Sequence, residues 1–399
     1  MNNGGERKFW VSALNDPARI APSASRKGPV RFYDTTLRDG EQTVGVALDP
    51  QQKLEIARLL DSLGVSRIEA GFPRVSADDA EAFGLVCHAG LRAEIWGFAR
   101  AVHADLDEVI RLGARATVIE IPASEIKLRA YGITAEDSIR RAAEAVGHAV
   151  KHGLTVAFFP VDGTRAELGH LRALYVAAFE AGAKEAVIVD TIGACGPEAA
   201  GFLVGQIREW LGPAVPLHFH GHNDFGLATA CAVAAVRAGA NWIQGTINGM
   251  GERAGNADLG EVAMALECIY GVETELNLEK IRNVSRHVRN VSGYALEPWK
   301  PVVGENLFMR ESGAVASQFH IPEAIEPFSA DIVHARREIV LGKKSGLDSI
   351  AIKSRDLGLD VPEAQRAAVL AAVKQKGIEK RGLLTEQEFR AIVSAVCGR

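Results

Sequence analysis

From Val30 onward, short apolar runs alternate with longer segments in which apolar residues recur at helical spacing. Each cycle takes roughly 25–35 residues, which is typical of β-strands alternating with α-helices around a parallel sheet. Eight runs are predicted to be strands: Arg31–Thr35, Arg67–Gly71, Glu94–Phe98, Thr117–Ile121, Thr155–Phe159, Ala186–Asp190, Val215–His220 and Trp242–Thr246. Eight strands over about 240 residues fit a closed (β/α)8 barrel, the TIM barrel, better than an open doubly wound sheet.

The pattern divides the chain into four parts. Residues 1–29 are rich in Gly, Ser, Asn, Pro and charge, so we expect an N-terminal arm. Residues 30–272 form the barrel, which is the predicted catalytic domain. Residues 273–350 begin with a predicted helix and continue as a stretch punctuated by Gly and Pro, which indicates a linker or lid. Residues 351–399 are predicted to form a small helical appendage, with Thr385 capping its last helix.

The overall composition narrows the class of function. The chain has 399 residues, a formal net charge of −5 and 47% hydrophobic residues. A low net charge without long basic runs argues against nucleic acid and against an anionic membrane as the main partner. Charged residues interrupt the most apolar stretches before the roughly 20 residues that a membrane span needs. A small-molecule enzyme is therefore the favoured class.

Cysteine usage indicates the compartment. The five cysteines are widely spaced and include no CxxC pair, and the amino terminus has no leader with a charged and then an apolar region. An odd number of scattered cysteines fits a reducing environment, so we expect a cytoplasmic protein.

Polar residues gather where the predicted strands end. In a barrel of this kind the working face lies at the carboxyl ends of the strands, so side chains there converge on one site. The candidates are Arg38, Asp39, Gln42, Glu69, Ser124, Asp162, Thr191, His220, His222 and Asn256. The sequence therefore predicts one active site on this face.

His220 and His222 lie two residues apart at the end of the seventh predicted strand, where period two sends both imidazoles to one side. An isolated histidine at a strand end more often forms a hydrogen bond to a neighbouring loop. Here Asp39 and Asn256 would complete a mixed nitrogen and oxygen ligand set suited to Mg²⁺, Mn²⁺ or Zn²⁺. We therefore predict a divalent metal site, with His218 supporting a ligand rather than binding the ion.

Arg38 places a permanent cation beside a candidate ligand carboxylate, where it would stabilise an enolate or alkoxide oxygen as charge develops. The alternative for Arg38 is an ion pair with Glu41 or Glu69. Thr191 and Ser124 follow strand ends, where each would either donate to a substrate carboxylate or cap a helix.

Five motifs contain all of these candidates except Ser124 and Asp162: DTTLRDGEQ from Asp34, EAGFP from Glu69, VDTIG from Val189, HFHGHNDFGLA from His218 and NGMGERAGN from Asn248. Together and in this order they resemble the motifs of the DRE-type TIM-barrel metallolyases. RDGEQ points to the branch that holds 2-isopropylmalate, homocitrate and citramalate synthases. The resemblance covers residues 30–350, since PVVGENLF and LGKKSG also look like the segment that follows the barrel in that branch.

The resemblance implies a Claisen-type condensation. An acyl-CoA, expected to be acetyl-CoA, loses an α-proton and adds to the carbonyl of a metal-bound 2-oxo acid; thioester hydrolysis then releases CoA and an alkylmalate-like or homocitrate-like product. The matched positions imply Asp39, His220, His222 and Asn256 as metal ligands, Arg38 as the catalytic arginine and Thr191 as the residue that holds the substrate carboxylate. We add Glu69 to the catalytic residues and Gln42, Ser124 and Asp162 to the substrate-binding residues. A homodimer is expected, because family members commonly dimerise through the segment after the barrel.

The chain differs from this branch in the segment after the barrel, which in the synthases supplies a group for proton transfer. The synthases usually carry a stretch like HESGIHxDG, and this sequence has Arg310 and Val315 in place of its two histidines. Valine cannot transfer a proton. The usual GKHSG reads GKKSG here, no tyrosine follows Tyr294, and the Glu-Asp pair common on the fifth strand is Val161-Asp162.

Three explanations remain open. A displaced residue such as His320, Lys344 or Arg310 transfers the proton, with His320 our candidate; or the substrate needs no such base; or condensation is lost. The alternatives to a synthase are a metal-dependent carbon–carbon lyase or aldolase of the same superfamily and a barrel that binds ligand without turnover. The fifth strand also lacks the Arg with which lysine-pathway homocitrate synthases hold a second carboxylate, which argues against 2-oxoglutarate as substrate.

Overall fold

Two compact units make up the chain in the computed structural model, which describes residues 9–15 and 29–398. The barrel unit comprises Ser12–Leu296, and the C-terminal unit combines Met1–Val11 with Glu297–Arg399. Most of the predicted N-terminal arm, residues 1–29, lies outside the described residues. In its described part, Phe9 forms an antiparallel bridge with Phe328 of the same unit.

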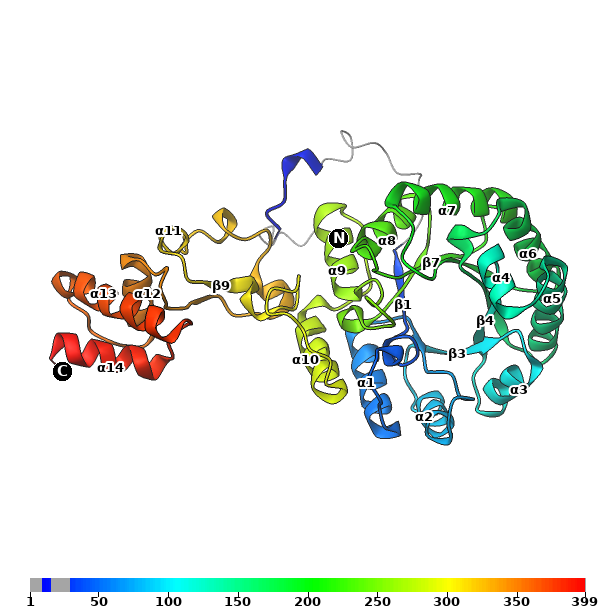
Figure 1. The fold of residues 1–399 in the computed structure, drawn as a ribbon, viewed down its shortest axis with the longest axis horizontal. Helices are drawn as coiled ribbons and strands as arrows, with labels where there is room; N and C mark the ends of the chain where they lie inside the picture. Colours follow the sequence, from blue (N-terminus) through cyan, green and yellow to red (C-terminus); the bar gives the residue numbers. More distant parts are fainter. Residues whose placement is uncertain (1–8, 16–28, 399) are drawn as a thin grey trace. The chain divides into compact units, whose positions relative to one another are not determined.

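Eight parallel strands form a closed barrel, which confirms the fold predicted from the sequence (Figure 1). The strands are β1 (Arg31–Asp34), β2 (Arg67–Glu69), β3 (Glu94–Arg100), β4 (Ala116–Pro122), β5 (Thr155–Val161), β6 (Glu185–Asp190), β7 (Leu217–Gly221) and β8 (Trp242–Gly245). β1 closes the ring on β8, with Tyr33 opposite Gln244 and Asp34 opposite Gly245. Closure therefore places the loop after β1 beside the loop after β8.

Helices surround the ring of strands (Figure 1). They are α1 (Pro50–Leu63), α2 (Ala77–Cys87), α3 (His103–Arg111), α4 (Glu125–Tyr131), α5 (Ala135–Lys151), α6 (Leu168–Glu180), α7 (Pro197–Leu211), α8 (Ala228–Arg237), α9 (Leu259–Met264) and α10 (Ile281–Ser292). Local sequence sets the ends of α1: Asp49 and Gln52 form a capping box, and Gly64 ends the helix with φ of 95°. A Cβ at Gly64 would lie 2.5 Å from the Glu275 backbone oxygen, so glycine is required there.

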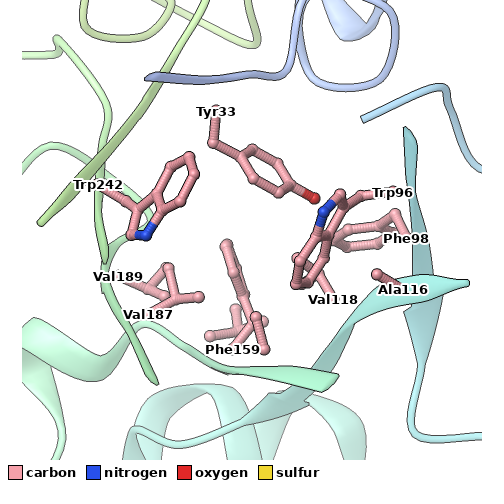
Figure 2. Packing of buried hydrophobic residues seen from close by; sticks show 11 residues of the cluster. Tyr33, Trp96, Phe98, Ala116, Val118, Phe159, Val187, Val189 and Trp242 are labelled. Carbon is pink, nitrogen blue, oxygen red and sulfur yellow. The ribbon is translucent and has the colours of Figure 1, made fainter. Parts of the chain in front are cut away.

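Packed side chains fill the inside of the barrel (Figure 2). The buried cluster includes Tyr33, Trp96, Phe98, Ala116, Val118, Phe159, Val187, Val189 and Trp242, which come from β1, β3, β4, β5, β6 and β8. Its aromatic rings meet edge to face, with ring centroids 5.6 Å apart for Tyr33 and Trp96 and 6.1 Å apart for Phe98 and Phe159. Because the interior is packed, chemistry is confined to the ends of the strands.

A charged network is buried at the amino-terminal half of the barrel. Arg67 donates two hydrogen bonds to Glu185, at 2.6 and 3.0 Å. Glu185 also contacts Nε2 of His218 at 2.6 Å, and the other ring nitrogen of His218 lies 3.3 Å from Gln244 Nε2. Burial alone would raise the pKa of Glu185, but His218 and Arg67 outweigh it and hold the pKa at about 2. His218 thus supports this network, and the prediction that it supports a metal ligand is wrong.

The C-terminal unit contains a short parallel sheet and a group of helices. Its elements are β9 (Met309–Arg310), α11 (Gly313–Ala316), β10 (Glu338–Ile339), α12 (Leu347–Asp356), α13 (Glu363–Lys380) and α14 (Glu386–Cys397). Ile350, Val373 and Phe389 are buried in its core. Thr385 caps α14 as predicted, in a capping box with Glu388. Within the described parts of both units, no helix combines the length and the apolar character that crossing a bilayer requires.

Replacing Arg67 by methionine tests the buried network. The Arg67→Met variant leaves the Glu185 charge buried without its cation, so we expect it to lower the free energy of unfolding by about 3–5 kcal/mol at pH 7. Urea unfolding followed by tryptophan fluorescence measures this, since the rings of Trp96 and Trp242 lie 4.4 and 3.8 Å from the guanidinium. Arg140→Met on the exposed face of α5 is the matched control and should leave the transition unchanged. Equal transitions for the two variants would contradict a stabilising role for the network.

Candidate active site

Asp39, His220 and His222 meet at the carboxyl end of the barrel, and all three are buried. Asp39 precedes the short 3-10 helix η2 (Gly40–Gln42) after β1, whereas His220 lies in β7 and His222 follows it. Asp39 Oδ2 lies 3.4 Å from His220 Nε2 and 3.6 Å from His222 Nε2. The two Nε2 atoms lie 3.4 Å apart. Three potential ligand atoms thus surround one point.

These separations fit three ligands of a single ion. Ligand bonds of about 2.1 Å place neighbouring ligand atoms about 3.0 Å apart at an octahedral centre and about 3.4 Å apart at a tetrahedral one. Hydrogen bonds between a carboxylate and imidazoles are shorter, at about 2.7–3.2 Å. One carboxylate and two imidazoles form a donor set for a divalent cation. Among the described residues, these three are the group of His, Cys, Asp and Glu side chains close enough together to share one ion.

Five buried polar atoms without a hydrogen-bond partner among the described residues belong to side chains of this site: Asp39 Oδ1, Asn256 Oδ1, His220 Nδ1, His222 Nδ1 and Arg38 Nη2. Others of this kind belong to other side chains, such as Gln244 and Arg337. Buried polar atoms in native proteins are nearly always paired, so such a cluster indicates a bound ion or ligand. Asn256 is held beside His222 by an antiparallel bridge, and its Nδ2 donates to the Met250 oxygen at 3.0 Å. The bridge places the backbone of Asn256 next to that of His222, and the role of Asn256 as the fourth ligand stays a prediction.

Glycines in the loop after β8 permit this approach. Gly251 has φ of 153°, and a Cβ there would collide with Asn256 Nδ2. Gly255 has φ of 82°, and a Cβ there would collide with the Gly249 oxygen. Residues other than glycine are strained in such conformations. The glycines of the NGMGERAGN motif are thus a backbone requirement of the site.

Burial and neighbouring charges set the protonation of the cluster. Burial alone would raise the pKa of Asp39, but Arg38 and the two imidazoles outweigh it and hold this pKa well below its usual range. Burial lowers the pKa of His222 to about 4. At neutral pH Asp39 is therefore an anion and His222 is neutral, which are the forms that bind a cation.

Arg38 makes three contacts that leave one of its nitrogens free. Its Nε donates to Glu69 at 2.5 Å and its Nη1 to Asp39 at 3.1 Å. The guanidinium carbon lies 4.2 Å from the centroid of the Phe98 ring. Glu69 also accepts from the Tyr33 hydroxyl at 3.1 Å, so both its oxygens are used. Arg38 thus forms the ion pair with Glu69 that the sequence analysis gave as an alternative, and its Nη2 remains unpaired beside the metal cluster. A direct catalytic role for Glu69 stays a prediction.

Ser124, Asp162 and Thr191 form a chain of hydrogen bonds at neighbouring strand ends. Ser124 Oγ donates to Asp162 at 2.5 Å and accepts from the N–H of Lys127, which makes it the cap of α4. Both Asp162 oxygens also accept from Arg165. The Asp162 N–H donates to Thr191 Oγ1 at 2.7 Å. Ser124 therefore caps a helix, which is one of the two roles predicted for it. Contacts of Ser124, Asp162 and Thr191 with substrate remain predictions.

Two other predicted residues lie apart from this cluster. Gln42 is exposed at the end of η2 and lines a cavity of about 350 Å³ together with Leu37, Arg38 and Phe72. His320 is exposed and belongs to the C-terminal unit. Its role in proton transfer stays a prediction.

Sequence reasoning does not single out Arg253, which joins three loops of the site. Its guanidinium donates to Asp224 at 2.8 and 3.1 Å and to the Thr191 backbone oxygen at 2.8 Å. The loops after β6, β7 and β8 are thereby tied together. The available signal is a cation inside the GERAGN motif, but its partners lie far away in the sequence.

Comparison with known proteins gives close relatives over most of the chain. The family model for HMGL-like domains matches residues 29–288. The homocitrate synthase of Methanopyrus kandleri is 43% identical over 369 residues, which cover 92% of each chain. The 2-isopropylmalate synthase of Methanocaldococcus jannaschii is 40% identical over 378 residues, which cover 93% of this chain and 72% of that one.

Solved structures share the fold of the barrel. The HMG-CoA lyase of Bacillus subtilis superposes with a TM-score of 0.60 at 21% identity, covering 69% of this chain and 97% of that one. The HMG-CoA lyase of Acinetobacter baumannii, solved with coenzyme A and 3-methylmalate, gives 0.59 at 20% identity over 67% and 92% of the two chains. The family match and the identities to the synthases agree with the motifs, and this chain belongs to the HMGL-like family of DRE-type TIM-barrel metallolyases.

Proposed function

We propose that the protein is an acyltransferase of the synthase type, which joins an acyl-CoA, most simply acetyl-CoA, to a 2-oxo acid in a metal-dependent Claisen-type condensation. The observation that carries the proposal is the convergence of Asp39, His220 and His222 beside an Arg38 nitrogen that has no partner. The synthase names of relatives at 40–43% identity support the same reaction class.

Asp39, His220, His222 and Asn256 would hold a divalent ion, either Mg²⁺, Mn²⁺ or Zn²⁺. The unpaired Asn256 Oδ1 supports its place in the set. A divalent ion bound there supplies Lewis-acid polarisation of the carbonyl of the 2-oxo acid. The mixed donor set suits several ions, and the supply in the cell selects among them.

Arg38 is the group that stabilises negative charge developing on oxygen. Glu69 and Phe98 hold its guanidinium in place, so Nη2 needs no rearrangement to donate. Thr191 binds the substrate carboxylate with its hydroxyl, which Asp162 orients through its N–H. Ser124 acts one step further away by orienting Asp162. Gln42 borders the cavity beside Arg38 and would contact substrate there.

The wall formed by β3 and β5 favours a small apolar 2-oxo acid. Phe98, Phe159 and Val161 belong to the apolar cluster at this wall. A second substrate carboxylate buried against these side chains would lack a cation, which costs several kcal/mol, on the order of 2–5. Pyruvate and 2-oxoisovalerate are therefore preferred over 2-oxoglutarate.

The protein is further proposed to be a cytoplasmic homodimer. All five cysteines are free, which suits a reducing compartment. Dimerisation follows from the resemblance to the synthases, which commonly dimerise through the segment after the barrel. Light scattering coupled to gel filtration should give twice the chain mass of 42.7 kDa. A single-chain mass at micromolar concentration would reject the dimer.

Release of free CoA thiol tests the reaction itself. Purified protein with Mn²⁺ or Mg²⁺ is incubated with acetyl-, propionyl- or malonyl-CoA and with pyruvate, 2-oxoisovalerate, oxaloacetate or 2-oxoglutarate. We expect thiol release that requires both substrates and is highest with the apolar 2-oxo acids. Release without a 2-oxo acid would indicate a thioesterase, and silence in all pairs by metal-loaded protein would overturn the synthase. Cleavage of alkylmalyl-CoA thioesters would then favour the lyase.

Metal binding tests the ligand set independently of turnover. His220→Ala removes one of three converging donors, so we expect the Mn²⁺ dissociation constant to rise at least about 100-fold, as read by calorimetry on metal-stripped protein. His152→Ala is the matched control, because it removes an exposed imidazole at the C-terminal end of α5, and it should retain the ion. Circular dichroism verifies that both variants fold. Stoichiometric tight binding of Mn²⁺ by folded His220→Ala would refute the assignment.

A further inference from the structure

The proposed condensation needs a base for the α-carbon of the acyl-CoA, and Glu120 on β4 is a carboxylate that the site described above does not use. Backbone register pairs Glu120 with Arg100 on β3 and with Phe159 on β5. Ala116 and Val118, four and two residues earlier, belong to the packed core inside the barrel. Since side chains alternate along a strand, Glu120 is the next inward position, above that core at the mouth.

Contacts between aromatic rings connect the strand positions next to Glu120 with the metal cluster. Phe159, opposite Glu120, meets His220 edge to face with ring centroids 5.1 Å apart. Phe159 also contacts Phe98, over which the Arg38 guanidinium lies. Glu120 therefore stands in the same layer of the mouth as the residues that surround the proposed ion and Arg38.

Glu120 differs from its charged neighbours because its side chain has no hydrogen bond or ion pair with any described residue, although its backbone oxygen accepts from the Ala101 N–H. Arg100 is engaged by both oxygens of Asp105, at 2.7 and 3.0 Å. Glu69 is saturated by Arg38 and Tyr33. A partly buried carboxylate without a partner is available to a substrate.

The surroundings of Glu120 bring its titration close to neutrality. Burial raises the pKa of Glu120 to about 7. The negative charges of Asp105 and Glu69 add to this rise, whereas the positive charges of Arg38 and Arg100 oppose it. β5 faces it with the uncharged Phe159. A base with a pKa near the working pH combines a large ionised fraction with a strong affinity for the proton.

We propose that Glu120 is the catalytic base that removes the α-proton of the acyl-CoA; this assignment rests on the proposed synthase function. Asp162 cannot serve, because both its oxygens accept from Arg165 and one also accepts from Ser124. Glu120 would thus supply a proton transfer that Val315, which stands in place of a histidine, cannot perform.

The step balances as follows. The α-carbon–hydrogen bond breaks and the proton passes to a Glu120 oxygen, while the electron pair forms a carbon–carbon bond to the carbonyl carbon of the 2-oxo acid. The carbonyl π pair becomes an alkoxide beside Arg38, the alkoxide takes up a proton, and Glu120 loses its proton to solvent. Water then adds to the thioester, the carbon–sulfur bond breaks, and CoA leaves as the free thiol with a carboxylate product.

Glu120→Gln keeps the shape of the side chain and removes the base. With the substrate pair found by thiol release, we expect kcat to fall about 10²–10⁴-fold while Mn²⁺ affinity and the KM for the 2-oxo acid stay within about twofold. The wild-type kcat/KM should rise with pH through about 7, because Glu120 must lose its proton to act, and the variant should lack this rise. A purely structural role would not remove a limb of the pH profile.

Two further variants keep the test decisive. Glu120→Asp retains a carboxylate and should recover part of kcat, with a larger isotope effect from α-deuterated acyl-CoA because proton removal becomes slower. Glu125→Gln, an exposed glutamate at the start of α4, is the matched control and should behave as wild type. His320→Ala measures the competing candidate in the C-terminal unit.

The outcomes separate the two proposals. If the wild type turns over and folded Glu120→Gln retains kcat or the pH dependence, the assignment of Glu120 is overturned and the synthase stands. The same holds if His320→Ala alone abolishes turnover. If the wild type is silent with every substrate pair, the synthase fails and the role of Glu120 fails with it.

Discussion

Closure of the sheet into a barrel is the constraint that brings the residues of the site together. Pairing of Asp34 with Gly245 places the loop that carries Arg38 and Asp39 beside the loop that carries Asn256. The contact continues past the strands, where the N–H of Ile247 donates to Thr36 Oγ1 at 2.9 Å. An open sheet would leave these loops at opposite edges, and the oxygen and nitrogen donors would never meet.

Arg38 links the parts of this site through its charge. As a buried cation it keeps Asp39 ionised, and it is itself compensated by Glu69 and by the face of the Phe98 ring. These contacts occupy Nε and Nη1 but not Nη2, so the residue is both firmly positioned and still able to donate. Preorganised donors of this kind lower the cost of charge development because they do not reorient during the reaction.

Much of this arrangement can be predicted from the sequence, and the limits have physical causes. The eight strands are recognisable because each apolar run is short and bounded by loop residues, and the histidine pair is recognisable because period two is a backbone property. Glu120 escapes this reasoning because strands of a barrel are buried on both faces, so Ile119 and Ile121 are as apolar as the inward positions and hide the alternation. The contacts of Asp162 with Arg165, and of Arg253 with Thr191, depend on side-chain directions that no spacing in the sequence reveals. The register of the folded barrel supplies that information.

The packed layer of Tyr33, Trp96, Phe98 and Phe159 lies between two groups of polar residues at opposite ends of the barrel. At one end Arg67, Glu185 and His218 form a closed charged network, while the proposed active site lies at the other end. Substitutions at the mouth therefore alter what is recognised without disturbing the network that supports the fold. Selection can then change substrate preference through a few strand-end side chains at little cost in stability. Relatives at 40–43% identity carry the names of both homocitrate and 2-isopropylmalate synthases, which is what we expect if strand-end side chains set the substrate.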